Sequence, residues 1–245
     1  MTAPTRRERL RTATLSEIKD GARRLLVTGG IEAVSLRAIA RDMGMTAPAI
    51  YRYFPSLEAL VVGLAGDLYD ELRQEVEAAR DRSGPDPAGQ LLEMCRALRR
   101  WAVGHPAEFT LIFGNPVPGM IEFADGCGDP DHPGARLGAV FLTPFVELTR
   151  GRPLPTPPAE LLQERLGGHL APLAANHGPL PIDVAYAFLS AWTRLYGLVA
   201  MEVFGHLGWA VDEPEALFET ELISQLRQFR PAEPGDALPE GGARH

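Results

Sequence analysis

Cysteine is scarce in this 245-residue sequence, and no stretch of it has the pattern of a β-strand. The two cysteines, Cys95 and Cys127, exclude a disulfide framework and a four-thiolate metal site. No segment alternates apolar and polar residues for long, so we expect an all-α fold. The N-terminus is polar and basic with no apolar core after it, which is unlike a secretory signal.

A long apolar run without charges is also missing. The most apolar long stretch, residues 186–211, contains Arg194, Glu202 and His206, which makes it a poor candidate for a membrane span. We therefore expect a cytoplasmic protein that contacts no membrane.

Basic residues are in short supply overall, with 24 Lys and Arg against 32 Asp and Glu. The shortage is uneven, because residues 1–55 hold ten basic and five acidic side chains, while the remaining residues hold 14 and 27. A basic segment joined to an acidic remainder is typical of a module that binds a polyanion.

Proline breaks helices, so proline-free intervals with apolar residues three and four apart predict helical segments. Thr14 with Glu17 fits a capping box, which predicts that the first helix begins at Thr14. Asp86 before Pro87 fits an N-cap followed by proline at the first helical position. Residues 231–245 have too few apolar side chains to form a core, and we expect a disordered tail there. The predicted helices span residues 14–28, 35–43, 46–53, 56–80, 87–104, 106–113, 135–150, 157–175, 182–207 and 214–229.

One segment gathers groups that could do chemistry. Residues 124–132 contain Asp125, Cys127, Asp129, Asp131 and His132, but their spacing fits neither a calcium loop nor a zinc site. The sequence also has no phosphate-binding Gly-Lys-Ser/Thr loop and no Gly-x-Ser-x-Gly elbow. We therefore expect a surface connection here, and we expect no catalytic residue, no metal site, no cofactor and no enzymatic activity.

Residues 35–54, SLRAIARDMGMTAPAIYRYF, have the pattern of two short helices joined at Gly44. This is the layout of a helix-turn-helix, in which the second helix enters the major groove of DNA. Pro48 is tolerated because it falls in the first turn of the second helix. The residues that can form the core between the two helices are Leu36, Ile39, Ala40, Ile50 and Phe54.

Together with the helices on either side, this segment resembles the DNA-binding domain of TetR-family transcriptional regulators. The resemblance rests on Tyr51-Arg52-Tyr53-Phe54, which matches the family's Tyr-x-x-Phe pattern, and on Gly30 with Ser35-Leu36-Arg37. Leu57 stands where the family usually carries a lysine. The resemblance implies a three-helix DNA-binding head at residues 13–58 after a basic arm at 1–12. It also implies a larger ligand-binding and dimerisation body at 59–230, with about nine or ten helices in all.

Carried onto this sequence, the resemblance implies a set of DNA contacts. Four further arginines, Arg6, Arg7, Arg9 and Arg11, form either an arm in the minor groove or a solvated tail, and the sequence leaves both open. The implied DNA-contacting residues are Ser35, Arg37, Thr46, Ala47, Pro48, Ala49, Tyr51, Arg52 and Tyr53.

The remainder should hold the sensing and dimerising parts. Helix 182–207 is apolar almost all round, which predicts burial on more than one face, and we expect it to form a homodimer interface with helix 157–175. Trp192, Tyr196 and Gly197 resemble a Trp-x-x-x-(His/Tyr)-Gly motif of one group of TetR-like C-terminal domains, here called WHG-like. The residues expected to bind a small effector are Met94, Trp101, Phe109, Phe113, Phe145, Trp192 and Tyr196.

The sequence thus predicts a ligand-responsive transcriptional regulator, most often a repressor in that family. It would bind a palindromic operator in double-stranded DNA as a homodimer and be released by a small, largely apolar effector. Helix 56–80 is the expected link between effector and DNA, because it begins two residues after Phe54. The alternative is a helical small-molecule-binding or adaptor protein whose DNA-binding head is vestigial.

Overall fold

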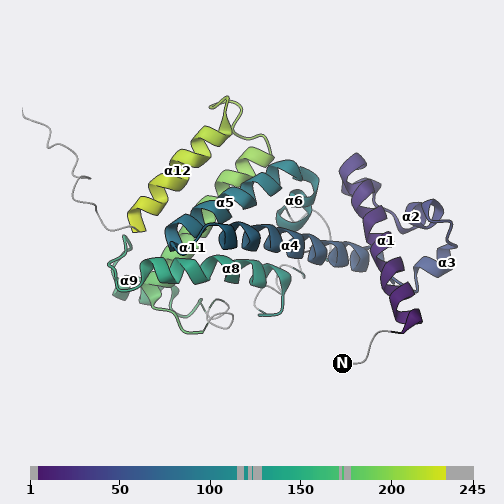
Figure 1. Ribbon diagram of the computed structural model, residues 1–245, viewed down its shortest axis with the longest axis horizontal. Helices are drawn as coiled ribbons and strands as arrows, with labels where there is room; N and C mark the ends of the chain where they lie inside the picture. The colour runs from purple at the N-terminus through teal and green to yellow at the C-terminus, as the bar shows by residue number, and fades with distance from the viewer. Residues whose placement is uncertain are drawn as a thin grey trace, which may run out of the picture.

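The computed structural model describes residues 5–114, 119–120, 123, 129–170, 173 and 178–229. Within these residues every regular element is a helix, so the all-α prediction is confirmed. A small head of three helices lies at one end of an elongated molecule, and a larger helical body forms the rest (Figure 1). The α-helices are α1 (Arg6–Gly29), α2 (Leu36–Asp42), α3 (Ala47–Ile50), α4 (Leu57–Arg82), α5 (Pro87–Gly104), α6 (Pro106–Phe113), α8 (Pro133–Thr149), α9 (Ala159–Leu166), α11 (Ile182–Val203) and α12 (Pro214–Phe229).

Helix α1 begins eight residues earlier than the sequence predicted. Thr5 is its N-cap, and the Thr5 and Glu8 side chains form the capping box by binding each other's backbone N–H groups. Thr14 lies inside the helix and donates its hydroxyl to the Leu10 carbonyl, so the predicted box at Thr14 and Glu17 is wrong. Both Thr-x-x-Glu sequences satisfy the capping pattern, and good helix formers between them carry the helix across the second one.

The three head helices enclose a small apolar core, as the helix-turn-helix pattern predicted. Ile18 of α1, Ile39 of α2 and Ile50 of α3 are each no more than 1% exposed. Gly44 has a φ of 64°, a left-handed conformation that glycine adopts without strain, and it makes the turn between α2 and α3. Helix α3 is shorter than the predicted 46–53, because residues 51–53 form turns rather than α-helix.

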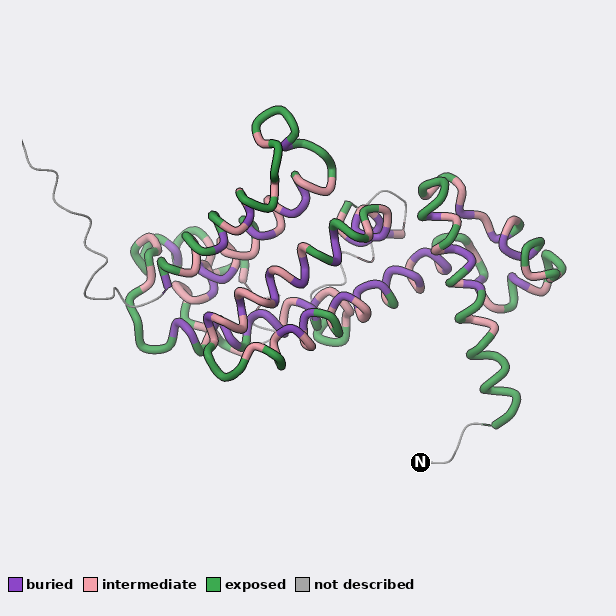
Figure 2. Tube along the Cα trace, turned by 45° about the horizontal axis from the view of Figure 1, so that its top comes forward, coloured by how far each residue is buried: buried purple, intermediate pink, exposed green. Residues whose placement is uncertain are grey.

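Helix α4 joins the head to the body and runs through the middle of the body (Figure 1). Its buried side chains recur every four residues along most of its length, while other faces remain partly exposed (Figure 2). It packs against α5, α6 and α8 of the body and against α1 of the head. The head–body boundary predicted at residue 58 therefore falls in the first turn of one continuous helix. The buried residues of this stripe are Leu60, Leu64, Leu68, Leu72 and Val76.

The remaining helix ends follow local chemistry. Asp86 caps α5 by accepting hydrogen bonds from the Ala88 and Gly89 N–H groups, with Pro87 at the first position as predicted. The predicted helix at 157–175 is helical as α9 only over Ala159–Leu166, and part of its C-terminal half lies outside the described residues. Helix α11 ends at Val203 rather than at residue 207, and Gly205 follows with a φ of 71°. Residues 1–4, 124–128 and the predicted tail at 231–245 also lie outside the described residues.

Candidate DNA-binding and effector sites

The residues expected to contact DNA lie on α2, α3 and the turn after α3, at the end of the head farthest from the body (Figure 1). Arg37 is exposed in the first turn of α2, and Ser35 caps that helix by accepting the Ala38 N–H at 3.5 Å. Ala49 and Tyr53 are half-buried. The expected contact residues that are exposed on and beside α3 are Thr46, Ala47, Pro48, Tyr51 and Arg52.

The two tyrosines after α3 have different surroundings. Tyr51 is 45% exposed and makes no hydrogen bond within the described residues, so its ring and hydroxyl remain accessible to a partner. Tyr53 is half-buried, and the Arg11 guanidinium of α1 lies 5.6 Å from its ring centroid. Sequence reasoning missed this cation–π contact, because it treated Arg11 as part of an arm that precedes the first helix.

Leu57, at the point where the family usually has a lysine, is 37% exposed in the first turn of α4. No charge stands there to meet a phosphate. Positive charge is available instead from the arginines of α1, α2 and the turn after α3. Within the described residues, no ion pair is formed by Arg6, Arg7, Arg9, Arg11, Arg37, Arg41 or Arg52.

One arginine of the head is bound to the body instead. The Arg23 guanidinium donates to both carboxylate oxygens of Glu71 on α4, at 2.6 and 3.1 Å, and to Glu108 on α6 at 3.0 Å. Glu108 is only 3% exposed, and Arg23 is its ion-pair partner within the described residues. The indole N–H of Trp101 on α5 also donates to Glu71, at 2.8 Å. We call Arg23, Glu71, Trp101 and Glu108 the joint network, since it joins α1 to three helices of the body.

Charge balance in the joint network favours an ionised Glu71. Burial alone would raise the pKa of this carboxyl, but hydrogen bonds from Arg23 and Trp101 outweigh it and lower the pKa. The His105 ring stacks on the Trp101 indole with centroids 5.1 Å apart, and its Nδ1 lies 2.9 Å from the Trp101 carbonyl oxygen. Lys19 of α1 adds an ion pair with Asp67 of α4. The orientation of the head is therefore fixed by polar contacts as well as by the continuous helix α4.

The residues expected to bind an effector fall in two separate places. Phe145 of α8 and Trp192 of α11 line an apolar cavity of about 40 Å³ between α5, α8, α11 and α12. Phe109, Phe113 and Tyr196 do not line it, and they pack on one another with ring centroids 4.8 to 6.4 Å apart. Met94 and Trp101 do not line this cavity either. Met94 is fully buried in the core, and Trp101 belongs to the joint network.

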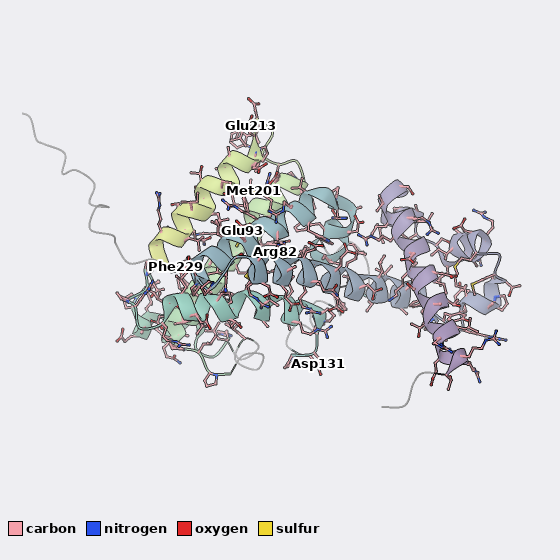
Figure 3. All side chains as sticks on the ribbon, viewed as in Figure 1. Arg82, Glu93, Asp131, Met201, Glu213 and Phe229 are labelled. Atoms are coloured by element: carbon pink, nitrogen blue, oxygen red, sulfur yellow. The ribbon has the colours of Figure 1, made fainter. Side chains whose placement is uncertain are left out.

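The cavity is almost entirely apolar. No charged residue lines it, and Gln225 of α12 supplies a side-chain amide. Burial raises the pKa of the Cys95 thiol to about 12, which keeps that group neutral. A volume of about 40 Å³ is far below the roughly 300–1,000 Å³ of typical ligand pockets. An effector bound here would therefore have to displace side chains such as Phe229 at the end of α12 (labelled in Figure 3).

Helix α11 has an apolar outer face that the described residues leave uncovered. By length and composition α11 could cross a membrane, and a third of its apolar stretch is buried. A core helix of a soluble protein passes the same test, so this is weak evidence for a membrane span. A Cβ added at Gly197, in the middle of this face, would meet no atom within 4 Å. Met201 (labelled in Figure 3) and Phe204 are 41% and 38% exposed. The outer face carries Tyr186, Ser190, Thr193, Gly197, Met201 and Phe204, and the charged residues Asp183 and Arg194 lie at its edge.

Within the described residues, no group of His, Cys, Asp and Glu side chains could hold a metal ion. The described end of the 124–132 segment has local roles: Asp129 accepts the Asp131 N–H, and His132 caps α8 by accepting the Gly134 N–H. Its other members, Asp125 and Cys127, lie outside the described residues.

Comparison with known proteins covers both parts of the molecule. Residues 18–64 match the family described as "Bacterial regulatory proteins, tetR family", and residues 91–224 match "Tetracyclin repressor-like, C-terminal domain". The chain is similar to the HTH-type transcriptional regulator Rv1816 of Mycobacterium tuberculosis, with 39% identity over 215 residues that cover 84% of this chain and 88% of that protein.

Solved structures agree. The regulatory protein SCO4313 superposes with a TM-score of 0.69 at 34% identity, over 91% of this chain and 100% of that chain. RolR, solved with the ligand resorcinol, has the same fold at a TM-score of 0.52 and 17% identity, over 91% of this chain and 96% of that chain.

Proposed function

Because the chain belongs to the TetR family of transcriptional regulators, we propose that it is a repressor that binds a palindromic operator as a homodimer. The observation that supports operator binding is the uncovered surface of α3 and of the turn after it, where Thr46, Pro48, Tyr51 and Arg52 are exposed. A helix presented in this way fits the major groove, and two heads related by a two-fold axis would meet the two halves of an inverted repeat. This activity requires access to the chromosome, so the protein would act in the cytoplasm.

Selection of bound duplexes from a random pool tests this function. We expect enrichment of an inverted repeat, and we expect Tyr51→Ala to reduce the preference for it by about 1–3 kcal/mol per half-site if the side chain contacts base edges. Arg37→Ala should weaken binding to all sequences, whereas Arg100→Ala, which removes an exposed arginine of the body, should not. A pool that yields no repeat would favour the alternative, an adaptor protein with a vestigial head.

The outer face of α11 is our candidate for the centre of the homodimer interface. Its small residues, with Gly197 in the middle, would let the same helix of a second copy approach closely. Helix α12 is one candidate for the second position, because it exposes Ala216, Thr220 and Ile223, although Glu215, Glu221 and Arg227 are exposed as well. Helix α9, which the sequence suggested, is the other, because it exposes Leu161 beside Glu160, Glu164 and Arg165. We therefore propose α11 as the centre of the interface, with α9 or α12 beside it.

For the effector, we propose a small, largely apolar compound that enters the cavity between α5, α8, α11 and α12. The apolar lining supports this chemistry, and RolR, of the same fold, binds the small aromatic compound resorcinol. Toluene is a suitable probe and should raise the melting temperature of the wild type. Ala191→Phe, whose ring would occupy the cavity, should abolish that rise. An equal rise in both proteins would contradict this location.

The joint network offers a route from this cavity to the head. Leu91 and Cys95 line the cavity, and Trp101 lies on the same helix, α5, where it binds Glu71. A displacement of α5 would thus act on the carboxylate that holds Arg23 of the head. An effector changes operator affinity only if it binds the DNA-competent and incompetent arrangements unequally, and the joint network is where these arrangements would differ.

A further inference from the structure

A basic groove lies between the first turns of α1 and the turn that follows α3, with a volume of about 640 Å³. Four arginines line it: Arg6, Arg7 and Arg11 from α1, and Arg52 from the other side. Tyr53 contributes its ring, which the Arg11 guanidinium covers. The groove thus borders the surface of α3 that we assign to the operator.

The positive charge of this groove is not neutralised. None of its four arginines has a carboxylate partner within the described residues. Glu8 is the acidic residue closest in sequence, and its carboxylate is held by the Thr5 N–H, with a pKa lowered by that hydrogen bond. Exposed guanidinium groups that converge on one groove are suited to phosphate, which they bind with paired hydrogen bonds.

The groove is also preformed. The Thr5–Glu8 capping box fixes the first turn of α1, and the cation–π contact with Tyr53 fixes Arg11. Arginines on a formed helix lose less conformational entropy on binding than arginines on a flexible arm. The positive end of the α1 helix dipole lies at the same place and adds to the attraction for an anion.

We propose that this groove holds the sugar-phosphate backbone of duplex DNA that flanks the major groove occupied by α3. The inference rests on the proposed operator binding and extends it to a second surface. The sequence left open whether the N-terminal arginines form an arm in the minor groove or a solvated tail. The structure instead places them on the helix α1. An α-helix with side chains is about 10–12 Å wide, whereas the minor groove of B-DNA is about 6 Å wide, so residues 6–11 do not fit there as a helix.

Arg9 provides a matched control for the test. It lies on the same turns of α1, carries the same charge and is exposed, but it does not line the groove. The test variant is the triple substitution Arg6→Gln, Arg7→Gln and Arg11→Gln, and the control is Arg9→Gln. Far-UV circular dichroism checks that both are folded.

The measurement is the dependence of duplex affinity on salt concentration, made with the selected operator and long flanking sequence. Each phosphate neutralised contributes about 0.9 to the slope of log K against log salt. We expect the triple variant to lower the slope by about 5 for a dimer, which is about 1.8 per arginine, and we expect Arg9→Gln to lower it by much less than about 1.8. The ratio of affinities for the operator and a mismatched operator should stay unchanged in both, because backbone contacts carry no sequence information.

A second measurement leaves the protein unaltered. Neutral methylphosphonate linkages placed one at a time along the flanks should weaken wild-type binding at a few adjacent positions beside each half-site. The triple variant should lose this sensitivity. The wild-type measurement tests the groove even if the triple variant folds poorly.

Several results would overturn the proposal. They are an unchanged slope in the triple variant, a fall in slope for Arg9→Gln that equals the fall per arginine in the triple variant, or methylphosphonate positions that have no effect. If inorganic phosphate raises the melting temperature of the wild type but not of the triple variant, while the methylphosphonate positions have no effect, the groove binds free anions and not duplex DNA. Operator selection that succeeds while the slope does not respond would reject the groove and leave the proposed function intact. Failure of the selection itself would reject both.

Discussion

The head and the body use arginine in opposite ways. In the body, Arg96 of α5 binds Glu219 of α12 at 2.6 Å, and Arg99 binds Glu202 of α11 at 2.7 Å with both side chains only 11% exposed. These pairs fix the positions of neighbouring helices. In the head, Arg6, Arg7, Arg9 and Arg11 of α1 and Arg52 beside α3 are exposed and have no carboxylate partner within the described residues, and Arg24 makes only a surface pair with Asp42. Charge thus serves internal geometry in the body and remains available for a polyanion in the head.

Arg23 departs from this division. It belongs to the head, yet it is bound as the body arginines are, to Glu71 and to the buried Glu108. The sequence separations are 48 and 85 residues, so the contact exists only once the head has docked on α4 and α6. Arg23 thus helps to set the orientation of the head on the body, whereas the exposed arginines of the head are available to bind its partner.

The largest effect should come from two substitutions on opposite faces of α11, which separate the fold of the body from its assembly. Val199 is fully buried within the protomer, and an unpaired charge there costs several kcal/mol, so Val199→Asp should unfold the protein. Met201 lies on the outer face and is 41% exposed, so Met201→Asp should give a folded monomer. Circular dichroism and sedimentation velocity distinguish the two outcomes.

Leu161→Asp tests whether α9 also belongs to the dimer interface. Leu161 is 42% exposed, as Met201 is, but lies on the helix that the sequence proposed as the second interface element. If α12 takes that position instead, Leu161→Asp should remain dimeric. A Met201→Asp variant that sediments as a dimer would remove α11 from the interface.

The second prediction concerns a substitution that removes Arg23 from the joint network between the head and the body. Arg23→Met leaves Glu108 with a buried and unpaired carboxylate. Breaking a fully buried ion pair costs about 3–5 kcal/mol. Because Arg23 is 30% exposed, we expect a loss of about 2 kcal/mol in the free energy of unfolding. Urea unfolding at a fixed protein concentration measures it.

A double substitution provides the control for the joint. Arg23→Met with Glu108→Leu removes the stranded charge and should recover part of the lost stability, since apolar replacement of a buried pair is often close to neutral. If the double variant is less stable than Arg23→Met alone, Glu108 has another favourable partner and the account of the joint network is wrong. Operator affinity of the double variant then reports whether the joint also sets the orientation of the head.

The sequence predicted those features that depend on neighbours along the chain. The core positions Leu36, Ile39 and Ile50, the turn at Gly44 and the Asp86 cap follow from local spacing, and the structure confirms them. Features that depend on distant partners were missed. The joint network pairs residues far apart in sequence, and the small cavity depends on how side chains from four helices pack. The basic groove was missed because two capping boxes compete and only the structure shows which one begins α1.

The smallest predicted effect is a loss of stability at acidic pH. It should come from ion pairs of the body more than from the surface of the head. A hydrogen bond from Arg96 lowers the pKa of Glu219 below 4.5, its value in an unfolded chain. A carboxyl whose folded-state pKa is lowered stabilises the fold fully above its unfolded pKa. That contribution is lost as the pH falls below 4.5 and through the folded-state pKa. Glu71 in the joint network follows the same rule, because its pKa is lowered as well.

Melting temperatures recorded between pH 6 and pH 3 would measure this dependence. Glu219→Gln cannot titrate, so its melting temperature should be lower than that of the wild type at pH 6 and approach it as the pH falls. The shift should be small, because Arg96 and Glu219 are 30% and 28% exposed and water screens their attraction. Asp212→Asn, which removes an exposed carboxylate from the connection between α11 and α12, serves as the control and should stay parallel to the wild type. If Glu219→Gln also runs parallel, the ion pairs of the body contribute to geometry without a measurable contribution to stability. The head and the body would then differ in whether their arginines are paired, and this pairing would make no measurable difference to stability.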